Sequence, residues 1–207
     1  MEKYSVFLRA FEPDDYILIN KWRNDPEIQR LTAGHRRYVS SEMEKEWVRS
    51  KMLNNNTDIY LAICTNDEHG KMIGYLSINN IDHWNRTADA GGIVIGDKKE
   101  QNAFAATEAT FLQLEYVFEE LNIHKLSGTC LVEHKASLLP SLCLGYKIEG
   151  VMRDNRFKGG KYHDEVLFSI LENEYYSAKS EGVYEMRSFI KKVAELRREI
   201  KKGKKIL

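Results

Sequence analysis

The segment DKKEQNAFAATEA, residues 97–109, combines residue types and a position that suit it to hold an anion. It follows an apolar run at residues 92–95 and leads into a long amphipathic segment. A turn between a strand and a helix N-terminus exposes backbone N–H groups, and the positive end of the helix dipole adds to their attraction for a phosphate. Such turns are usually rich in glycine, because the backbone must approach the ligand closely and often takes positive φ. This turn has no glycine between Gly96 and Gly128, so its other residues must decide whether it binds a phosphate.

The other residues with reactive side chains form no compact motif. The six histidines are scattered, and no H-x-x-x-H or C-x-x-C pair occurs, so the sequence predicts no metal site. Three cysteines without close spacing (Cys64, Cys130 and Cys143) favour reduced thiols and a cytoplasmic protein. The charged N-terminus shows no signal-peptide pattern, and no run approaches the ~18 apolar residues of a membrane span. We therefore expect no membrane partner.

The N-terminal third predicts one strand followed by two helices. The strand covers residues 6–11, and the first helix, residues 12–27, is closed by the Asp25-Pro26 pair, because a residue before proline avoids the helical region. The second helix covers residues 40–53. Its Ser41-x-x-Glu44 spacing fits a capping box, and Met43, Trp47 and Val48 are expected to form its apolar face.

The remainder of the body alternates strands and helices. The patterns predict three strands, a long helix, a strand, a short helix and a closing hairpin around Gly159-Gly160, a dipeptide typical of a type I′ turn. Because the long helix crosses between the third of these strands and the next one, we expect those two strands to be parallel neighbours. The predicted ranges are strands 58–65, 71–80 and 87–96, helix 100–122, strand 124–132, helix 135–145, and strands 146–157 and 161–171.

The C-terminal tail differs in charge from the body. Between Arg187 and Leu207 there are nine Lys or Arg against two Glu, so the tail carries about +7 and the rest of the neutral chain about −7. Apolar residues in the tail form a narrow helical stripe, namely Met186, Phe189, Val193, Leu196 and Ile200. We expect this helix to pack on its own domain or on a partner subunit in a homodimer. Binding to anionic lipid or nucleic acid is the alternative, and too few aromatic residues interleave its basic residues to favour nucleic acid. The predicted domains are 1–175 for the body and 176–207 for a basic helical extension.

Several blocks in this order resemble the Gcn5-related N-acetyltransferase (GNAT) family, in its branch of ribosomal-protein, polyamine and amino-sugar acetyltransferases. The blocks are LRAFEPDDYILINKWRNDPEI, INNIDHWNRTADAGGIVIGDKK, ATEA…LEYVFEELNIHKL and LGYKIEGVMRDNRFKGGKYHDEVLFSIL, which together cover residues 6–173. The resemblance implies an α+β fold, with a mixed but mostly antiparallel twisted sheet of about seven strands flanked by about four helices. The basic helix would be added at the C-terminus.

The resemblance also implies where acetyl-CoA would bind. The strands at 87–96 and 124–132 would splay apart, and the pantetheine arm would enter the gap and pair with free backbone groups. A main-chain N–H there would polarise the thioester carbonyl and stabilise the developing oxyanion. The turn would hold the pyrophosphate, and a lysine would meet the 3′-phosphate. The residues that the resemblance assigns to acetyl-CoA are Ile93, Val94, Ile95, Lys98, Lys99, Gln101, Asn102, Ala103, Phe104, Ala105, Thr107 and His134.

Two positions depart from the family pattern. The family turn reads Q/R-x-x-G-x-G/A, and the direct alignment places Lys99, Asn102 and Phe104 at its three defining positions. A one-residue shift would instead put Ala103 and Ala105 at the glycine positions, and the sequence allows both registers. Many members also carry a tyrosine four residues before the glycine of the LGF motif, as the acid for the departing thiolate. That position here is Ser141, which is a far weaker acid.

The acceptor amine arrives as an ammonium ion and must lose a proton to a base. His83 and Asp89 lie near the expected acceptor cleft and are the candidate bases. The function implied is an acetyl-CoA-dependent N-acetyltransferase acting on a primary amine of a small molecule, sugar or peptide. The acidic body favours cationic acceptors. A GNAT-fold module with weak or no catalysis, retained for binding or regulation, is the alternative, and use of a longer acyl donor is a third interpretation.

Overall fold

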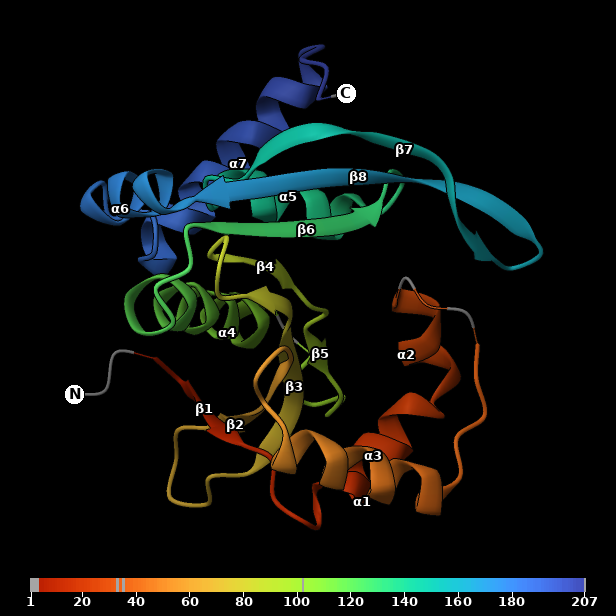
Figure 1. Ribbon diagram of the computed structural model, residues 1–207. Helices are drawn as coiled ribbons and strands as arrows, with labels where there is room; N and C mark the ends of the chain where they lie inside the picture. The colour runs from red at the N-terminus through yellow and green to blue at the C-terminus, as the bar shows by residue number, and fades with distance from the viewer. Residues whose placement is uncertain (1–3, 33, 35, 102, 207) are drawn as a thin grey trace.

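The computed structural model of the chain describes residues 4–206 except 33, 35 and 102 (Figure 1). Its N-terminal part is one strand followed by three helices that lie to one side of the sheet. The α+β architecture expected from the sequence is confirmed. The elements of this part are β1 (Val6–Ala10), α1 (Asp15–Arg23), α2 (Pro26–Leu31) and α3 (Ser41–Leu53).

The rest of the described chain supplies seven strands and the remaining helices. The strands are β2 (Ile59–Thr65), β3 (Met72–Asp82), β4 (Thr87–Ala90), β5 (Val94–Ile95), β6 (Lys125–Leu131), β7 (Lys147–Lys158) and β8 (Lys161–Leu171). The helices are α4 (Ala103–Glu115), which continues into a π-helical turn (Tyr116–Glu120), α5 (Lys135–Cys143), α6 (Glu172–Ser180) and α7 (Met186–Lys201).

One mixed sheet of eight strands organises the chain. Its order is β1-β2-β3-β4-β6-β8-β7, and β5 pairs separately with β3. Every pairing is antiparallel except β4 with β6, which is parallel. The predicted parallel neighbours are therefore confirmed. At the closing hairpin, Gly159 and Gly160 have φ of 59° and 82°, as a type I′ turn requires.

The predicted single strand 87–96 is interrupted in its middle. Ala90 pairs with Ile78 and Val94 pairs with Tyr75, so three residues, 91–93, lie opposite two residues of β3. The extra residue is a β-bulge, which bends the strand and breaks the ladder locally. A side chain at position 91 cannot fit, because a Cβ there would lie 1.9 Å from Oγ of Ser77. The strand therefore divides into β4 and β5.

Helices cover both faces of the sheet. On the β2–β3 side, Ala105 and Ala109 of α4 pack against Ile63 and Ile73. The opposite face of the same strands packs against residues of α1 and α3, among them Ile19, Trp22 and Val48. On the β6–β8 side, α5, α6 and α7 join α4 in the largest core cluster. α4 thus packs against both halves of the sheet.

The C-terminal helix belongs to that largest cluster. Phe189 is buried, and its ring meets the ring of Phe111 from α4 edge to face at 5.8 Å. Just before α7, the hydroxyl of Tyr184 donates to the carbonyl of Leu144 at 3.1 Å. The apolar stripe therefore packs on the body of the same chain, which is one of the predicted arrangements.

Three local predictions in the N-terminal helices were wrong. Pro26 begins a further helix, α2, because proline suits the first helical turn and the Asp25 side chain accepts a bond from the Glu27 amide. Ser40, not Ser41, caps α3, accepting from the Met43 amide. Met43 is exposed and Glu44 is fully buried in its place, whereas Trp47 and Val48 pack in the core as predicted.

The buried Glu44 lies among aromatic residues and one cation. Its Oε1 is 2.9 Å from the Arg23 guanidinium, whose carbon lies 3.7 Å from the centre of the Trp47 ring. Burial raises the pKa of Glu44, and the Arg23 charge lowers it in part. This cluster links α1 to α3. Because the Glu44 carboxylate is buried against Arg23, it is not available for the predicted capping box.

Gly96 tests how tightly the N-terminal core is packed. A Cβ at this position would lie 2.0 Å from the Trp22 ring, so we expect Gly96→Ala to lower the free energy of unfolding by about 1–3 kcal/mol through overpacking. Urea unfolding would measure it. Gly150→Ala is the matched control, because nothing lies within 4 Å of a Cβ there. Equal stability of the two variants would contradict the packing described.

Candidate active site

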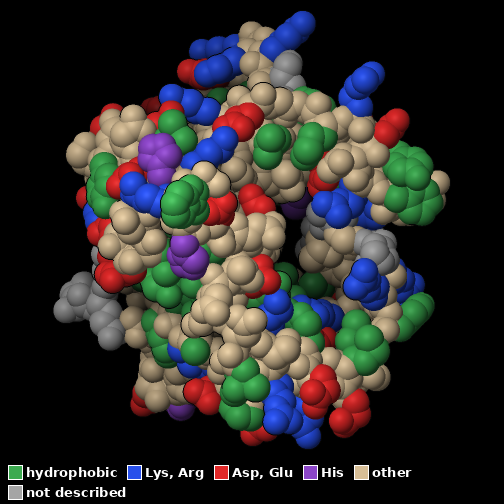
Figure 2. All heavy atoms as spheres, in the orientation of Figure 1, with side chains coloured by type: hydrophobic (Ala, Val, Ile, Leu, Met, Phe, Trp, Pro, Cys, Tyr) green, Lys and Arg blue, Asp and Glu red, His purple; other side chains and the backbone are tan. Residues whose placement is uncertain are grey.

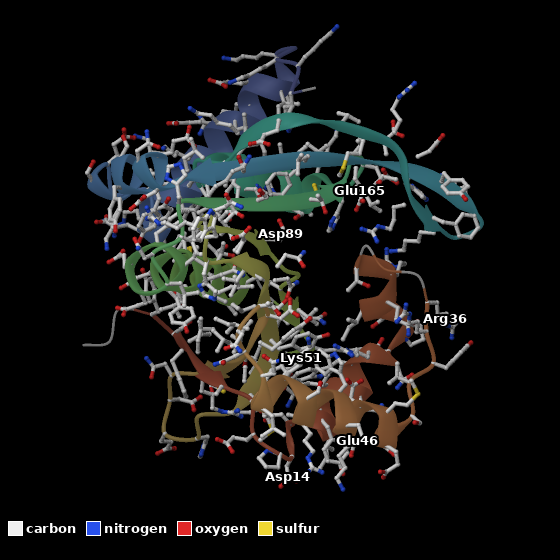
Figure 3. All side chains as sticks on the ribbon, viewed as in Figure 1. Asp14, Arg36, Glu46, Lys51, Asp89 and Glu165 are labelled. Atoms are coloured by element: carbon white, nitrogen blue, oxygen red, sulfur yellow. The ribbon has the colours of Figure 1, made fainter. Side chains whose placement is uncertain are left out.

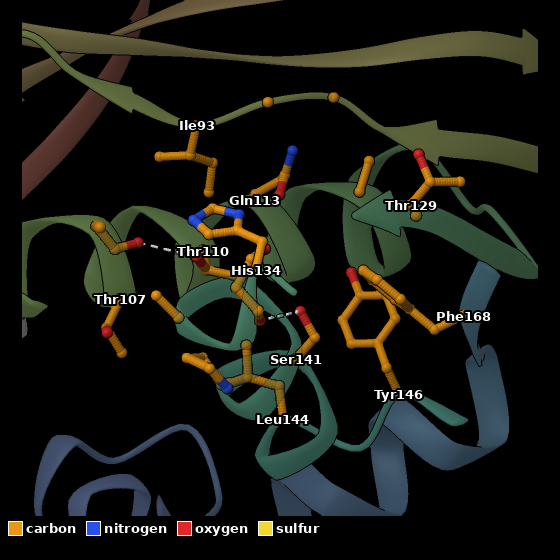
Figure 4. Close-up of a pocket in the computed structure, with 18 of the residues that line it drawn as sticks. Ile93, Thr107, Thr110, Gln113, Thr129, His134, Ser141, Leu144, Tyr146 and Phe168 are labelled. Atoms are coloured by element: carbon orange, nitrogen blue, oxygen red, sulfur yellow. Dashed lines mark hydrogen bonds between the residues drawn. The ribbon is translucent and has the colours of Figure 1, made fainter. Parts of the chain in front are cut away.

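A cavity of about 370 Å³ opens where the two halves of the sheet separate (Figure 4). The parallel ladder between β4 and β6 ends at the pair Asp89–Ser127, whereas β6 continues to Leu131 paired only with β8. The bulge, α4, α5 and the open edge of β6 form the walls. The residues that line the cavity include Gly91, Gly92, Ile93, Thr107, Gln113, His134, Ser141, Tyr146 and Phe189.

The bulge presents backbone donors to this cavity. The Gly91 amide donates to the carbonyl of Ser77 at 2.8 Å, and the buried Gln113 donates to the same carbonyl at 2.9 Å. Among the described residues, no acceptor is bonded to the amides of Gly92 and Ile93. A backbone N–H beside a cavity needs an acceptor from solvent or from a ligand. Gly91 and Gln113 thus share the Ser77 carbonyl of β3 as acceptor, and the amides of Gly92 and Ile93 remain available to a ligand.

The turn before α4 is occupied by its own hydrogen bonds. The amides of Gly96 and Asp97 both donate to the Ile73 carbonyl. The Lys99 amide donates to the Asp97 carboxylate at 2.9 Å, and this carboxylate also pairs with Lys71. These contacts, with the Lys71 hydrogen bond the largest, lower the pKa of Asp97. An anion here would be met by the N-terminal turn of α4 rather than by residues 96–99.

The residues predicted for the turn point in several directions. Lys98 pairs with Asp25 and Glu27 of the α2 N-terminus. The Gln101 amide group donates to the Ile95 carbonyl at 2.9 Å. Phe104 is 52% exposed and is not among the residues that line the cavity. Asn102 and the side chain of Ala103 lie outside the described residues, and Ala105 faces the core under the sheet. Their roles toward a coenzyme stay predictions.

Strand alternation separates the three predicted β-strand residues. Ile93 lines the cavity and Ile95 packs on the α4 side of the sheet. Val94 is buried on the other face, in the cluster with Trp22. Of the remaining predicted residues, Thr107, His134 and Ser141 all line the cavity, so the structure brings these three together with Ile93 (Figure 4). The Ser141 hydroxyl donates to the Ser137 carbonyl at 3.1 Å.

The two predicted bases lie away from this cavity. His83 is exposed in the turn after β3, with Nε2 3.0 Å from the carbonyl of Asn56. Asp89 on β4 (Figure 3) accepts a 2.8 Å bond from the Asn80 amide group, and the neighbouring Ala88 is buried in the core. Neither is among the residues that line a described cavity, so the structure provides no support for either as the base.

Tyr146 is a lining residue that the sequence reasoning missed. It is buried, its ring meets Phe168 edge to face at 5.4 Å, and Figure 4 shows its hydroxyl directed toward the cavity. No hydrogen-bond partner for this hydroxyl is found among the described residues. Burial raises the pKa of Tyr146 far above its usual value, so the phenol keeps its proton. The signal was present in the sequence, since tyrosine stands directly after Gly145 where the motif LGF has phenylalanine.

A second cavity of about 390 Å³ lies between α2, the end of β6 and the β7–β8 hairpin. Figure 2 shows the molecule hollowed in this region, with Lys and Arg side chains on the rim. His134 lines both cavities, so the two meet at this residue. The residues lining the second cavity are Arg30, Thr32, Leu131, Glu133, His134, Lys158, Gly159, Lys161 and His163.

One ammonium group joins the two sides of this second cavity. Lys158 at the end of β7 donates to the carbonyls of Gln29 and Arg30, at 3.4 and 2.9 Å, and to that of Thr32. These are carbonyls at the C-terminus of α2, which have no partner within a helix, and the negative end of the helix dipole favours a cation there. On the other side, His163 pairs with Glu133 and its second ring nitrogen lies 3.2 Å from the Lys158 carbonyl.

Comparison with known proteins agrees with this geometry. The family model described as an acetyltransferase (GNAT) domain matches residues 5–139. The chain belongs to the GNAT acetyltransferase family. Spermidine N(1)-acetyltransferase of Vibrio cholerae is 28% identical over 169 residues, which are 81% of this chain and 94% of that protein. YdaF of Bacillus subtilis, whose name describes it as a candidate ribosomal N-acetyltransferase, is 29% identical over 110 residues, or 53% of this chain and 59% of that protein.

The fold is shared with solved structures of this family. The crystal structure of spermidine N-acetyltransferase from Vibrio cholerae, in complex with CoA and spermine, superposes with a TM-score of 0.75 at 24% identity. It covers 83% of this chain and 98% of that chain. In the part of this chain that the structure describes, no helix is long and apolar enough to cross a membrane. The described residues also contain no group of three or more His, Cys, Asp or Glu placed to ligate a metal ion.

Removing the Lys158 ammonium should loosen the wall of the second cavity. We expect Lys158→Met to lower the free energy of unfolding by about 1–3 kcal/mol, because hydrogen bonds from a charged donor are lost and carbonyls of α2 are left without it. In the same variant, the rate of amide hydrogen exchange in residues 26–31 should rise. Lys191→Met, at an exposed site on α7, is the control. Unchanged exchange in α2 would contradict the assigned contact.

Proposed function

We propose that the protein is an acetyl-CoA-dependent N-acetyltransferase that acts on a primary amine. The observation that carries the proposal is the cavity at the split of the sheet, lined by Gly92 and Ile93, whose amides have no acceptor among the described residues. An extended pantetheine arm fits a gap between two strand edges, because it can pair with their open backbone groups. Family membership supports the same donor, and a solved relative holds CoA.

The reaction needs two groups to meet at the bulge. The amine nitrogen attacks the thioester carbon, the new C–N bond forms, and the negative charge collects on the carbonyl oxygen, where the Gly92 and Ile93 amides would stabilise it. The C–S bond then breaks, CoA leaves with the electron pair, and the nitrogen loses one proton to solvent to give the neutral amide. The amine would enter through the second cavity, since His134 borders both spaces. The coenzyme phosphates would lie at the N-terminal turn of α4, with Thr107 as a further donor.

Tyr146 is our proposed proton donor to the departing sulfur. Ser141 stands where the family often has a tyrosine, but its hydroxyl is a weak acid and already donates to the Ser137 carbonyl. Tyr146 presents an unpartnered phenol to the same cavity from the start of β7. The buried phenol still holds its proton, and a positioned side chain that holds a proton can donate it as the sulfur gains charge.

The basic helix would contribute to the donor site as well. We propose residues 1–175 as the acetyltransferase domain and 176–207 as an extension that completes it, because Phe189 of α7 lines the first cavity.

A binding module without catalysis is the second candidate. The observation that favours it is the turn at residues 96–99, whose described amides donate to Ile73 and Asp97 instead of facing a ligand. Weak coenzyme binding would follow, because fewer donors would be left for the diphosphate.

Acetyl-CoA should raise the melting temperature of the purified protein. Binding to the native state alone stabilises it, by about 2.7 kcal/mol when the ligand is at 100 times its Kd. Gly91→Ala should abolish most of this shift, because a Cβ there would lie 1.9 Å from Ser77 Oγ and displace the bulge. Gly150→Ala, which lines neither cavity and has nothing within 4 Å of a Cβ, should keep the shift. A folded wild-type sample that shows no shift would remove the support for the transferase and favour the binding module.

Replacing Tyr146 should slow turnover without weakening donor binding. We expect Tyr146→Phe to lower kcat by ~10²-fold, within the usual range for a positioned general acid, and to leave the acetyl-CoA melting shift intact. Release of the CoA thiol, with an amine that the wild-type protein acetylates, would measure kcat. Ser141→Ala is the matched control, and its kcat should be unchanged. An unaltered kcat in Tyr146→Phe, or a large loss in Ser141→Ala, would reverse the assignment.

A further inference from the structure

The charge of the second cavity points to a class of acceptor. We infer that the acceptor amine carries an anionic group, a phosphate or a carboxylate, which Arg30 and Lys161 hold while the amine reaches toward His134. This inference rests on the proposed function, because it identifies the second cavity as the acceptor site. It goes beyond that function by excluding polycations as preferred acceptors.

Cations outnumber carboxylates among the residues that line this cavity. Arg30, Lys158 and Lys161 contribute positive charge, and Glu133 is the one carboxylate among the described lining residues. Glu133 is engaged by the His163 ring. The cavity therefore carries a net positive charge when it holds no ligand.

One of the three cations is already hydrogen-bonded within the protein, and two are available to bind a ligand. Lys158 directs its ammonium to the backbone carbonyls of Gln29, Arg30 and Thr32. Arg30 and Lys161, by contrast, have no carboxylate within 4.0 Å among the described residues. They come from opposite walls of the cavity, α2 and the start of β8. A guanidinium and an ammonium on facing walls form a clamp that suits an oxyanion with more than one acceptor oxygen.

The mutual effects of these charges agree with an unbalanced cluster. Burial lowers the pKa of Lys158, and the neighbouring Arg30 charge lowers it further. The nearby Lys161 charge contributes, after a backbone hydrogen bond and the His163 contacts, to lowering the pKa of Glu133. An entering anion would relieve the repulsion between cations, whereas an entering polycation would add to it.

This local charge outweighs the charge of the whole body. The acidic body favours cationic acceptors, but charges more than ~8–10 Å away are largely screened at physiological ionic strength. Charges that line the cavity act on a bound acceptor at contact distance and are screened much less. Relatives named spermidine N(1)-acetyltransferase do not decide the acceptor of this chain, whose second cavity is lined by three cations and one carboxylate and would repel a polycation.

Paired amines that differ in one anionic group test the inference. With saturating acetyl-CoA, thiol release would compare D-glucosamine 6-phosphate with D-glucosamine, 4-aminobutyrate with butylamine, and spermidine alone. We expect kcat/KM to be at least 10-fold higher for the anionic member of at least one pair, and lower for spermidine. The pair that shows the preference identifies the anion as phosphate or carboxylate. Equal values within both pairs, or a preference for spermidine, would overturn the inference.

Charge-removing variants locate the preference. Arg30→Gln and Lys161→Gln should each reduce the anionic preference about 10-fold through KM, while Lys191→Gln, outside the cavity, should leave it unchanged. All three should keep the acetyl-CoA melting shift, since none lines the donor cavity. A preference that survives both cavity variants would place the anion elsewhere and overturn the assignment.

A failure of the proposed function gives a different result. If acetyl-CoA binds but no amine is turned over, calorimetric titration with D-glucosamine 6-phosphate and with D-glucosamine separates the two ideas. Binding that requires the phosphate and is lost in Arg30→Gln would retain the anion site without the transferase. Absence of phosphate-dependent binding would reject the anion site.

Discussion

The structure depends on the place where the only parallel ladder of the described sheet stops. β4 and β6 pair as far as Asp89 and Ser127 and then part, because the bulge at residues 91–93 turns one strand away while β6 continues along β8. Backbone groups on both edges are left to face a cavity instead of each other. The cavity, its unpaired amides and the position of α4 beneath it all follow from this one divergence. The need for glycine at position 91 is equally strict, since Ser77 and Asn79 leave no room for a side chain there.

Elements with a strong local signal were predictable from the sequence. The hairpin at Gly159-Gly160, the parallel relation of the strands around the long helix and the amphipathic C-terminal helix each depend on patterns within a short window or on a chain-crossing rule. The resemblance to the GNAT family was specific because several blocks agreed in order, and the family match confirms it. Four residues with predicted site roles, Ile93, Thr107, His134 and Ser141, line one cavity, and their roles stay predictions.

Features that arise from contacts distant in sequence were not predictable. Ser40 caps α3 in place of Ser41, and Glu44 is buried against Arg23 of α1, a partner that no local pattern contains. The bulge that splits strand 87–96 is set by its neighbour β3. Tyr146 lines the cavity because the short connection between α5 and β7 borders it. The cationic character of the second cavity combines α2 with a hairpin more than 120 residues later, as the contact between Lys158 and Arg30 illustrates, whereas the chain's total charge is zero.

The contact of Lys158 with α2 has a consequence for how this protein family can diversify. All three acceptors of the ammonium are main-chain oxygens, and every residue type supplies the same oxygen. The side chains of α2 can therefore be exchanged without undoing the tie between the helix and the hairpin. Substitutions in the α2 side chains that line the second cavity can therefore change which acceptor is recognised, while the contact between Lys158 and the α2 carbonyls is kept.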